Sequence, residues 1–299
     1  MVVKNTYFMI KKQNIKKYFQ QAGKLKMSNR NYCQQVKFLL GFFLQEDLAR
    51  EGDITSNLLI DANEVECVKI VAKQDGVLAG LEEVCWFLRQ HKIKCQSKIR
   101  DGQKISTGQT ILVLQGNLRK ILSLERTALN VLQRMSGIAT QTNQLVRKVG
   151  GKVLICPTRK TQWGLLDKKA VVIGGGGTHR LGLYDFVLIK DNHLKIANRE
   201  SRIVNLKNSF WEVEVESTKQ ALAMVKLNPK AMMFDNFKPA NIKKAIKGIK
   251  TINKNIIFEA SGGINEKNIV SYAKSGVDII SLGALTHSAK ALDVSLEIL

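Results

Sequence analysis

Six short apolar segments in the second half of the chain constrain its fold more than any other feature. Each is followed closely by a charged or polar residue or a glycine, and helical stretches such as 239–249 and 267–274 lie between several of them. A strand followed repeatedly by a helix is typical of a parallel sheet. The sequence therefore predicts an α/β fold whose sheet closes, or nearly closes, as a barrel. The predicted strands are Val153–Cys156, Phe186–Ile189, Trp211–Val215, Ala231–Phe234, Ile256–Phe258 and Val277–Leu282.

Cationic side chains follow the first two predicted strands. Arg159 and Lys160 come after the first strand, and Lys190 comes directly after the second. Because α/β barrels carry their chemistry at the carboxyl ends of the strands, these cations are expected to face one pocket.

Four successive glycines, residues 174–177, lie between these two strands and are followed by Thr178, His179 and Arg180. Each glycine costs about 1 kcal/mol relative to alanine in a helix, so this run predicts a loop. We expect the loop to let the backbone approach a ligand closely. The potential cations around it indicate a ligand with several negative groups.

Two carboxylates, Glu214 and Asp235, end the next two strands. Among cations they stay ionised, so they suit sugar hydroxyls, a water-bridged Mg²⁺ or a developing positive charge. Glu212 and Glu216 have the same strand parity as Glu214, and only position along the strand distinguishes the three. The alternative is a buried salt bridge with one of the lysines that follow the first two strands.

Small residues follow the last two strands. Ser261, Gly262 and Gly263 come after one strand, and Gly283 and Ala284 come after the other. Such residues expose backbone N–H groups, and barrel enzymes often hold a phosphate at the loops after their last two strands. The alternative is that these glycines only satisfy turn geometry. With the cations and carboxylates, the pattern predicts a sugar phosphate beside a second anionic group.

The first half of the chain has a different organisation. Helical stretches at 38–44 and 81–91 accompany several short strands, as in a small antiparallel α+β module of about 90 residues. Residues 118–149 follow helical spacing, with Glu125 on the apolar stripe and Arg126 at its edge. A charged pair on such a face is either an ion pair that fixes helix packing or a functional group. Gly137 is expected to divide this region into two helices.

The amino-terminal segment is strongly basic. Residues 1–45 hold nine Lys or Arg and no acid, in a chain of net charge +22. Three interpretations stay open: a surface for nucleic acid or membrane, a targeting peptide, or a dispensable extension over 1–26 with Met27 as the working start. The apolar run 36–44 is too short to span a bilayer.

The five cysteines are scattered and have no zinc-type spacing. This usage fits reduced thiols in a cytoplasmic protein. Cys156 lies near the predicted pocket, and we interpret it as a small buried apolar residue.

The strand-end motifs resemble those of the quinolinate phosphoribosyltransferase family, also called nicotinate-nucleotide pyrophosphorylase (carboxylating). The resemblance runs in unbroken order over residues 36–299. The motifs that carry it are Glu46-Asp47, Gly52-Asp53-Ile54-Thr55, Glu125-Arg126-Thr127-Ala128-Leu129-Asn130, Thr158-Arg159-Lys160-Thr161, Gly175-Gly176 with His179-Arg180, Lys190-Asp191-Asn192-His193, Glu212-Val213-Glu214-Val215, Phe234-Asp235-Asn236 and Glu259-Ala260-Ser261-Gly262-Gly263.

The resemblance implies an open, TIM-like α/β barrel with an N-terminal α/β sandwich domain, in a cytoplasmic homodimer whose active sites lie at the subunit interface. It implies boundaries at 27–117 for the sandwich and 118–287 for the barrel, with 288–299 packing on the sandwich. The implied reaction converts quinolinate and phosphoribosyl pyrophosphate to nicotinate mononucleotide, pyrophosphate and CO₂ with Mg²⁺, in NAD biosynthesis. No nucleic acid or membrane partner is expected.

The resemblance also assigns roles to residues. Lys160, Lys190, Glu214 and Asp235 are the expected catalytic set. The expected substrate-binding residues are Arg126, reaching in from the neighbouring subunit, Thr158, Arg159, Lys160, His179, Arg180 and Lys190 around the carboxylates and pyrophosphate, Glu214 and Asp235 on the ribose hydroxyls, and Ser261, Gly262, Gly263, Gly283, Ala284 and His287 near the 5′-phosphate.

One loop departs from the family pattern. Gln162-Trp163-Gly164-Leu165-Leu166 replaces a stretch that usually carries a proline and a further arginine. Rival interpretations are a relative of the same fold with another substrate, a Schiff-base aldolase using Lys160 or Lys190, and a nucleic-acid-binding protein.

Overall fold

The computed structural model describes residues 2–195, 206 and 209–298, and side chains from residue 9 onward. It divides into two compact units, each built from several parts of the chain. Unit 1 comprises residues 1–21, 144–160 and 176–285, and unit 2 comprises 22–143, 161–175 and 286–299. Among the described helices, none has the length and apolar character needed to cross a membrane.

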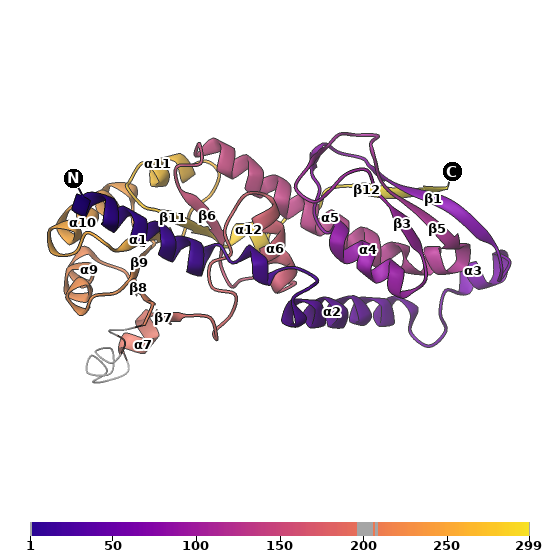
Figure 1. Cartoon of the computed structure of the whole chain (residues 1–299), viewed down its shortest axis with the longest axis horizontal. Helices are drawn as coiled ribbons and strands as arrows, with labels where there is room; N and C mark the ends of the chain where they lie inside the picture. Colours follow the sequence, from indigo (N-terminus) through magenta and orange to yellow (C-terminus); the bar gives the residue numbers. More distant parts are fainter. Residues whose placement is uncertain (1, 196–205, 207–208, 299) are drawn as a thin grey trace. The chain divides into compact units, whose positions relative to one another are not determined.

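Unit 1 contains a six-stranded parallel sheet in the order β6-β11-β10-β9-β8-β7. Its strands can be followed in Figure 1. They are β6 (Leu154–Pro157), β7 (Val187–Ile189), β8 (Trp211–Val215), β9 (Ala231–Asp235), β10 (Ile257–Ser261) and β11 (Ile279–Leu282). These strands agree closely with the six apolar segments, and the predicted open α/β barrel is confirmed.

Helices follow most of the strands of unit 1 along the chain. They are α7 (Asp191–Lys195), α9 (Thr218–Met224) with η3 (Val225–Leu227), α10 (Pro239–Ile252), α11 (Ile269–Ala273) and α12 (Ala284–His287), the last of which ends in unit 2. The unit also includes α1 (Val2–Phe19). All residues of β8 are buried, as expected where a parallel sheet is covered on both faces.

Unit 2 contains an antiparallel sheet in the order β12-β1-β5-β3. The carboxyl-terminal strand pairs with β1, with Val68 opposite Ile298. Leu81, Val84, Phe87 and Leu88 form the buried face of α4. The strands are β1 (Val65–Ala72), β3 (Lys94–Gln96), β5 (Thr110–Asn117) and β12 (Val294–Ile298), with β2 (Gly76–Val77) and β4 (Lys104–Ile105) in a separate pair; the helices are η1 (Ala22–Lys24), α2 (Arg30–Leu48), α3 (Ile54–Leu59), α4 (Leu81–Gln90) and α6 (Leu165–Ile173).

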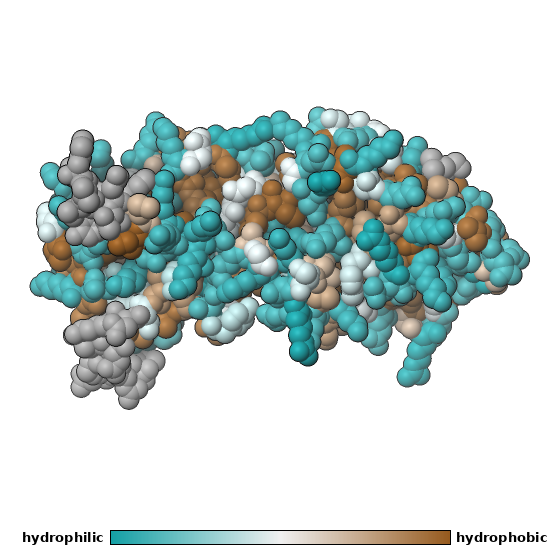
Figure 2. Space-filling view, in the orientation of Figure 1, coloured by the Kyte–Doolittle hydropathy of each residue, from teal (hydrophilic) through white to brown (hydrophobic). Residues whose placement is uncertain are grey.

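Hydrophilic side chains cover much of the face drawn in Figure 2, as expected for a chain with 47 Lys and Arg residues. Strand residues of both units contribute to the core, and Val68, Ile70, Ile257 and Ile279 are fully shielded from solvent.

The expectation that Gly137 divides the long helical region is wrong. Helix α5 (Leu118–Lys148) is continuous through it. A Cβ atom at Gly137 would lie 1.9 Å from the carbonyl oxygen of Lys290. The glycine therefore allows the carboxyl-terminal segment of unit 2 to pass directly against the helix, and a close backbone approach of this kind accepts no side chain.

Replacing Gly137 with alanine is expected to destabilise the protein by about 1–3 kcal/mol, because the new methyl group overlaps backbone that cannot move aside freely. Gly41→Ala is the matched control, since Gly41 also lies inside a helix and has nothing within 4 Å of its Cβ position. That control should be neutral or stabilising by up to about 1 kcal/mol. Denaturant unfolding measures both, and equal effects of the two changes would contradict this account.

Candidate active site

The carboxyl ends of neighbouring strands in unit 1 bring the predicted acids and small residues to one edge of the sheet. Asp235 of β9 is in register with Ser261 of β10, which is also in register with Ser281 of β11. Asn236 donates its backbone N–H to the carbonyl oxygen of Ser261 at 2.9 Å. The loops after β9 and β10 are therefore tied together.

These loops also fit tightly against each other. A Cβ atom at Gly262, where φ is +87°, would lie 2.3 Å from Oδ1 of Asn236. The side-chain amide of Asn236 donates to Oδ2 of Asp235 at 2.9 Å, which orients that carboxylate. At Gly263, where φ is +64°, the Cβ position is open. Ser261, Gly283 and Ala284 are half-buried at the same edge of the sheet.

Lys190 and Glu214 form an ion pair at the ends of β7 and β8. The Nζ of Lys190 lies 3.0 Å from Oε2 of Glu214. Glu214 therefore does form the salt bridge with a strand-end lysine that the sequence left open as an alternative. It does not remove Lys190 from the site, because 43% of the lysine side chain is exposed while only 9% of the glutamate is.

Arg159 and Arg180 add positive charge to the same unit. Burial lowers the pKa of Arg180, and the nearby charge of Arg159 lowers it further. Two guanidinium groups that repel each other favour a bound anion. Arg159 and Lys160 are exposed, and the backbone N–H of Lys160 donates to Oγ1 of Thr158 at 3.1 Å. This cationic set lies in the unit that also holds Glu214 and Asp235.

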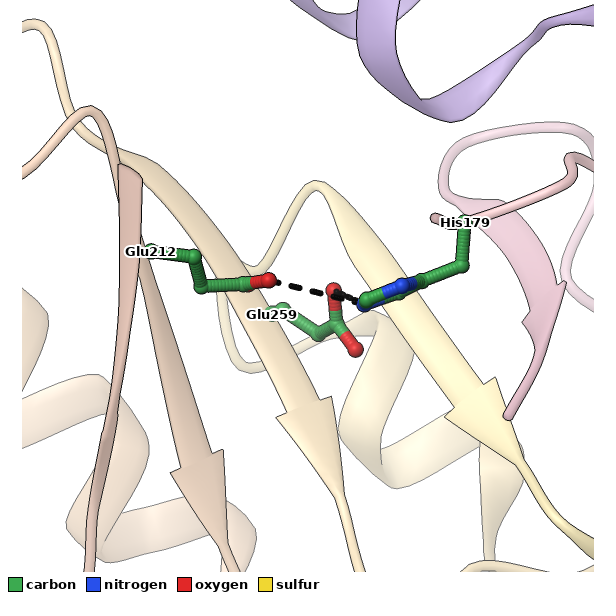
Figure 3. Close-up of side chains that lie close together, drawn as sticks. All are labelled: His179, Glu212 and Glu259. Atoms are coloured by element: carbon green, nitrogen blue, oxygen red, sulfur yellow. Dashed lines mark ion pairs between the residues drawn. The ribbon is translucent and has the colours of Figure 1, made fainter. Parts of the chain in front are cut away.

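His179 lies in the interior of the barrel, between two glutamates. Its Nε2 is 3.2 Å from Oε2 of Glu259 and 3.5 Å from Oε2 of Glu212, and both glutamates are fully buried. Figure 3 shows the three side chains converging. His179 has a φ of +48°, a conformation that costs a non-glycine residue energy and persists only where contacts enforce it. We call these three residues the interior cluster.

The interior cluster retains protons. Burial opposes protonation of His179, but the charges of Glu259 and Glu212 outweigh it and raise its pKa to about 9. Burial, together with the charge of Glu259, raises the pKa of Glu212 to about 7. The protons are shared among three closely coupled groups, so that less charge is buried without water.

The composition of the interior cluster resembles that of a metal site. The proton on Nε2 of His179 argues against this. The backbone N–H of Arg180 lies 2.7 Å from Nδ1 of His179, so Nε2, the nitrogen nearest the carboxylates, is the one that keeps its proton as the ring titrates. A protonated nitrogen cannot bind a cation, and a metal-binding histidine instead donates from its other nitrogen. We therefore interpret the cluster as ion pairs between His179 and the two glutamates.

The sequence placed His179 among the cations that surround the ligand. In the structure its side chain is only 6% exposed. The sequence also left the choice among three glutamates open: Glu212 faces the interior, Glu214 pairs with Lys190, and Glu216 is exposed. Glu259 was missed as a separate group. Its position two residues before Ser261, on the same face of β10, was the available signal.

The expectation for the glycine run was wrong at two of its positions. A Cβ atom at Gly174 would lie 2.5 Å from the carbonyl oxygen of Ala139 in unit 2, and one at Gly177 would lie 2.5 Å from that of Phe19 in unit 1. These glycines admit neighbouring protein backbone rather than a ligand. Gly175, with φ of +96°, is exposed.

Arg126 and His287 lie in unit 2. Arg126 is exposed and lines a pocket with Glu46, Asp47 and Asn130. The ring of His287 is exposed and contacts Ser288, with 2.6 Å between Nδ1 and Oγ.

Unit 2 contains an ionic network of its own, which the sequence did not predict. Asp167, fully buried, receives two hydrogen bonds from Arg134, at 2.8 and 2.9 Å. It also accepts the backbone N–H groups of Gln162 and Trp163. Arg134 in turn lies over the Trp163 ring at 5.1 Å. The loop 162–166, which departs from the family pattern, is therefore fixed by residues of its own unit.

The interior cluster predicts a pH dependence of stability. Both folded pKa values lie above the ordinary values of 4.5 and 6.5, so the cluster stabilises fully below those values and loses this contribution as pH rises through about 7 and about 9. Glu212→Gln removes one titrating group. The thermal midpoint of this variant is expected to fall less than that of the wild type between about pH 5 and about pH 8.

Glu216→Gln is the control, because Glu216 follows the same strand directly and is exposed; this variant should keep the wild-type slope. Thermal unfolding followed by circular dichroism at several pH values measures all three proteins. Parallel curves for the wild type and Glu212→Gln would show that the cluster does not titrate in this way.

Known proteins resemble this chain over most of its length. A family model described as quinolinate phosphoribosyl transferase, N-terminal domain, matches residues 53–136, and the C-terminal domain model matches residues 138–297. The probable nicotinate-nucleotide pyrophosphorylase [carboxylating] of Methanocaldococcus jannaschii is 44% identical over 261 residues, covering 83% of this chain and 92% of that protein. The corresponding Bacillus subtilis protein is 37% identical over 280 residues, covering 88% and 93%.

A solved structure is similar throughout. The nicotinate-nucleotide pyrophosphorylase from Francisella tularensis superposes with a TM-score of 0.80 at 35% identity, over 89% of this chain and 96% of that one. Both domain models match in order, and relatives well above 30% identity extend over most of the chain. The chain therefore belongs to the quinolinate phosphoribosyltransferase family.

Proposed function

We propose that this protein converts quinolinate and phosphoribosyl pyrophosphate to nicotinate mononucleotide, pyrophosphate and CO₂ in NAD biosynthesis. It is thus a decarboxylating pentosyltransferase. The observation that carries the proposal is the edge of the sheet in unit 1, where Lys190 and Glu214 form an ion pair and Asp235 is oriented by Asn236. Arg159 and Arg180 supply a second patch of positive charge in that unit.

The transfer step requires charge stabilisation more than a nucleophilic side chain. The pyridine nitrogen of quinolinate bonds to C1 of the ribose as the bond from C1 to pyrophosphate breaks, and positive charge develops on the sugar. Ionised Glu214 and Asp235 favour that charge and accept hydrogen bonds from the ribose hydroxyls. The cations Arg159, Lys160 and Arg180 spread the charge of the departing pyrophosphate.

Decarboxylation follows from the charge on the ring. Once the nitrogen is substituted, the ring is a cation, and loss of the adjacent carboxylate as CO₂ leaves an electron pair on the carbon next to that nitrogen. A proton then adds to this carbon to give nicotinate mononucleotide. Fixed cations such as Lys190 hold the carboxylate that stays on the pyridine ring. This positioning of the substrate supplies much of the rate.

Mg²⁺ fits the oxygen donors of this edge. Glu214 and Asp235 would hold the ion through water and the substrate, as its preference for oxygen ligands and retained water requires. When bound, it would neutralise charge on the pyrophosphate. Ser261, Gly262, Gly263, Gly283 and Ala284 would receive the 5′-phosphate.

The proposal includes a homodimer, in which Arg126 of one protomer completes the site of the other. An exposed arginine beside Glu46 and Asp47 supports this, because such a group is available to a second chain. We also propose a cytoplasmic location. All five cysteines lie within the described residues and none forms a disulfide, which supports a reducing compartment.

The decisive experiment supplies phosphoribosyl pyrophosphate with either quinolinate or nicotinate and measures nucleotide and CO₂. Equal amounts of nicotinate mononucleotide and CO₂ are expected from quinolinate, with little product from nicotinate. Product from nicotinate alone would indicate a non-carboxylating transferase, and product from neither would reject the proposal.

Removal of the charge of Lys160 or Arg126 is expected to lower kcat by roughly 10²- to 10³-fold, because each acts on developing or departing charge. Lys160→Ala and Arg126→Ala should retain the thermal midpoint of the wild type, since both side chains are exposed. Lys226→Ala, also exposed, is the control for a change in net charge and should keep full activity. Wild-type turnover by either test variant would refute the role of that residue.

Chelation of divalent cations is expected to abolish turnover, and excess Mg²⁺ should restore it. Asp235→Asn should raise the Mg²⁺ concentration needed for half-maximal rate, because one charged oxygen donor is lost. Steady-state assays over a range of Mg²⁺ concentrations measure this. Unchanged activity in chelator would remove Mg²⁺ from the mechanism.

A further inference from the structure

The basic amino-terminal helix α1 is part of the barrel unit. Phe19 is fully buried in a cluster with Cys156, Phe186, Ala231, Ile257 and Ile279. The members of this cluster come from, or immediately precede, β6, β7, β9, β10 and β11. Phe19 thus belongs to a buried cluster that is drawn from most strands of the sheet. The family models begin at residue 53, so nothing in the family match accounts for this contact.

Other α1 side chains contact residues at the amino ends of the strands. The Nζ of Lys11 lies 2.7 Å from Oδ2 of Asp278, just before β11, and 5.0 Å from the centre of the Phe258 ring. The Tyr18 ring stacks on Phe210, just before β8, at 3.9 Å. At least this part of the positive segment is therefore engaged within the protein rather than presented to nucleic acid or membrane.

The end of α1 bonds directly to the loop that carries His179 and Arg180. The backbone N–H of Thr178 donates to the carbonyl oxygen of Phe19 at 2.7 Å, and that of Gln21 donates to Oγ1 of Thr178 at 3.2 Å. Gly177 donates its N–H to Ile155 of β6 at 2.7 Å. Residues 177 and 178 thus lie between the edge strand β6 and the incoming segment 19–21, where the sheet is open.

The other end of this loop is held by the same segment. The side-chain amide of Gln21 donates to Oδ2 of Asp185 and also to the carbonyl oxygen of Tyr18, the latter at 3.0 Å. Asp185 in turn accepts the backbone N–H of Leu181 at 2.9 Å. The loop 178–185 is therefore attached to residues 19–21 at both ends.

Phe19 also supports the interior cluster. Its ring meets the His179 imidazole edge to face, with the ring centres 5.3 Å apart. Phe186 packs against both rings, at 5.4 Å from Phe19 and 5.6 Å from His179. This apolar packing fixes the plane of an imidazole whose backbone has an unfavourable φ.

We propose that Phe19 and Gln21 are positioning residues of the transferase: they hold the 178–185 loop, and through it Arg180 and His179, in the geometry that the reaction uses. Residues 1–26 are then not a dispensable extension, and a chain starting at Met27 would lack these contacts. The expected kinetic effects of this inference rest on the proposed function. The contacts of residues 19–21 with the loop do not depend on it.

Steady-state kinetics of Phe19→Ala and Gln21→Ala test the proposal. A misplacement of about 1 Å costs up to about a hundredfold in rate, so kcat/KM for quinolinate is expected to fall about tenfold to about a hundredfold in each variant. Gln21→Ala leaves the apolar cluster intact and keeps the test valid if Phe19→Ala folds poorly. Phe19→Leu, which refills most of the space, should recover most of the activity.

Met9→Ala is the matched control, because Met9 lies on the same helix and is 59% exposed. It should retain wild-type constants. Amide hydrogen exchange of the peptide 177–185, followed by mass spectrometry, is expected to rise in Gln21→Ala and not in Met9→Ala. This second measurement does not depend on the substrate, so it separates failure of this proposal from failure of the proposed function.

Constants within twofold of the wild type in both Phe19→Ala and Gln21→Ala would overturn the proposal. A loss of activity that disappears at lower temperature, where the variants are fully folded, would also overturn it, because the segment would then contribute only stability. Unchanged exchange of 177–185 in Gln21→Ala would do the same.

Discussion

The barrel unit depends on a charged contact that is enclosed away from water. Ionised groups in an apolar interior are costly unless they are paired or share protons. His179, Glu212 and Glu259 meet this requirement only together, and they come from a loop, from β8 and from β10. Their contact therefore fixes the relative position of three distant parts of the chain. The charges at the carboxyl ends of the strands are built on that fixed arrangement.

Much of this organisation is local in origin, and the sequence alone was sufficient for it. Apolar runs such as 211–215 specify buried parallel strands, and the residue that ends each run is placed at the sheet's edge by strand geometry. The pairing of Lys190 with Glu214 follows from two adjacent strands that each end in a charge. The predictions of the open barrel and of the residues at the strand ends both rest on this local pattern.

Features that depend on distant contacts could not be predicted. Gly137 looked like a helix break because nothing nearby shows that Lys290 passes against it. Gly177 suggested a ligand, yet the carbonyl of Phe19 occupies the space where its Cβ would be. Which glutamate of β8 turns inward is decided by Glu259 and His179, far along the chain. A single sequence contains these residues without showing which of them meet.

The docking of α1 also has a consequence for the order of folding. Two of the residues that α1 contacts, Phe258 and Asp278, lie near the other end of the chain. Contacts between such distant parts of a chain form slowly, because a large loop must close before they contribute. The contacts of Lys11 with Phe258 and Asp278 therefore form only after these late parts of the sheet are available. Complete docking of α1 is thus expected to be a late step in folding.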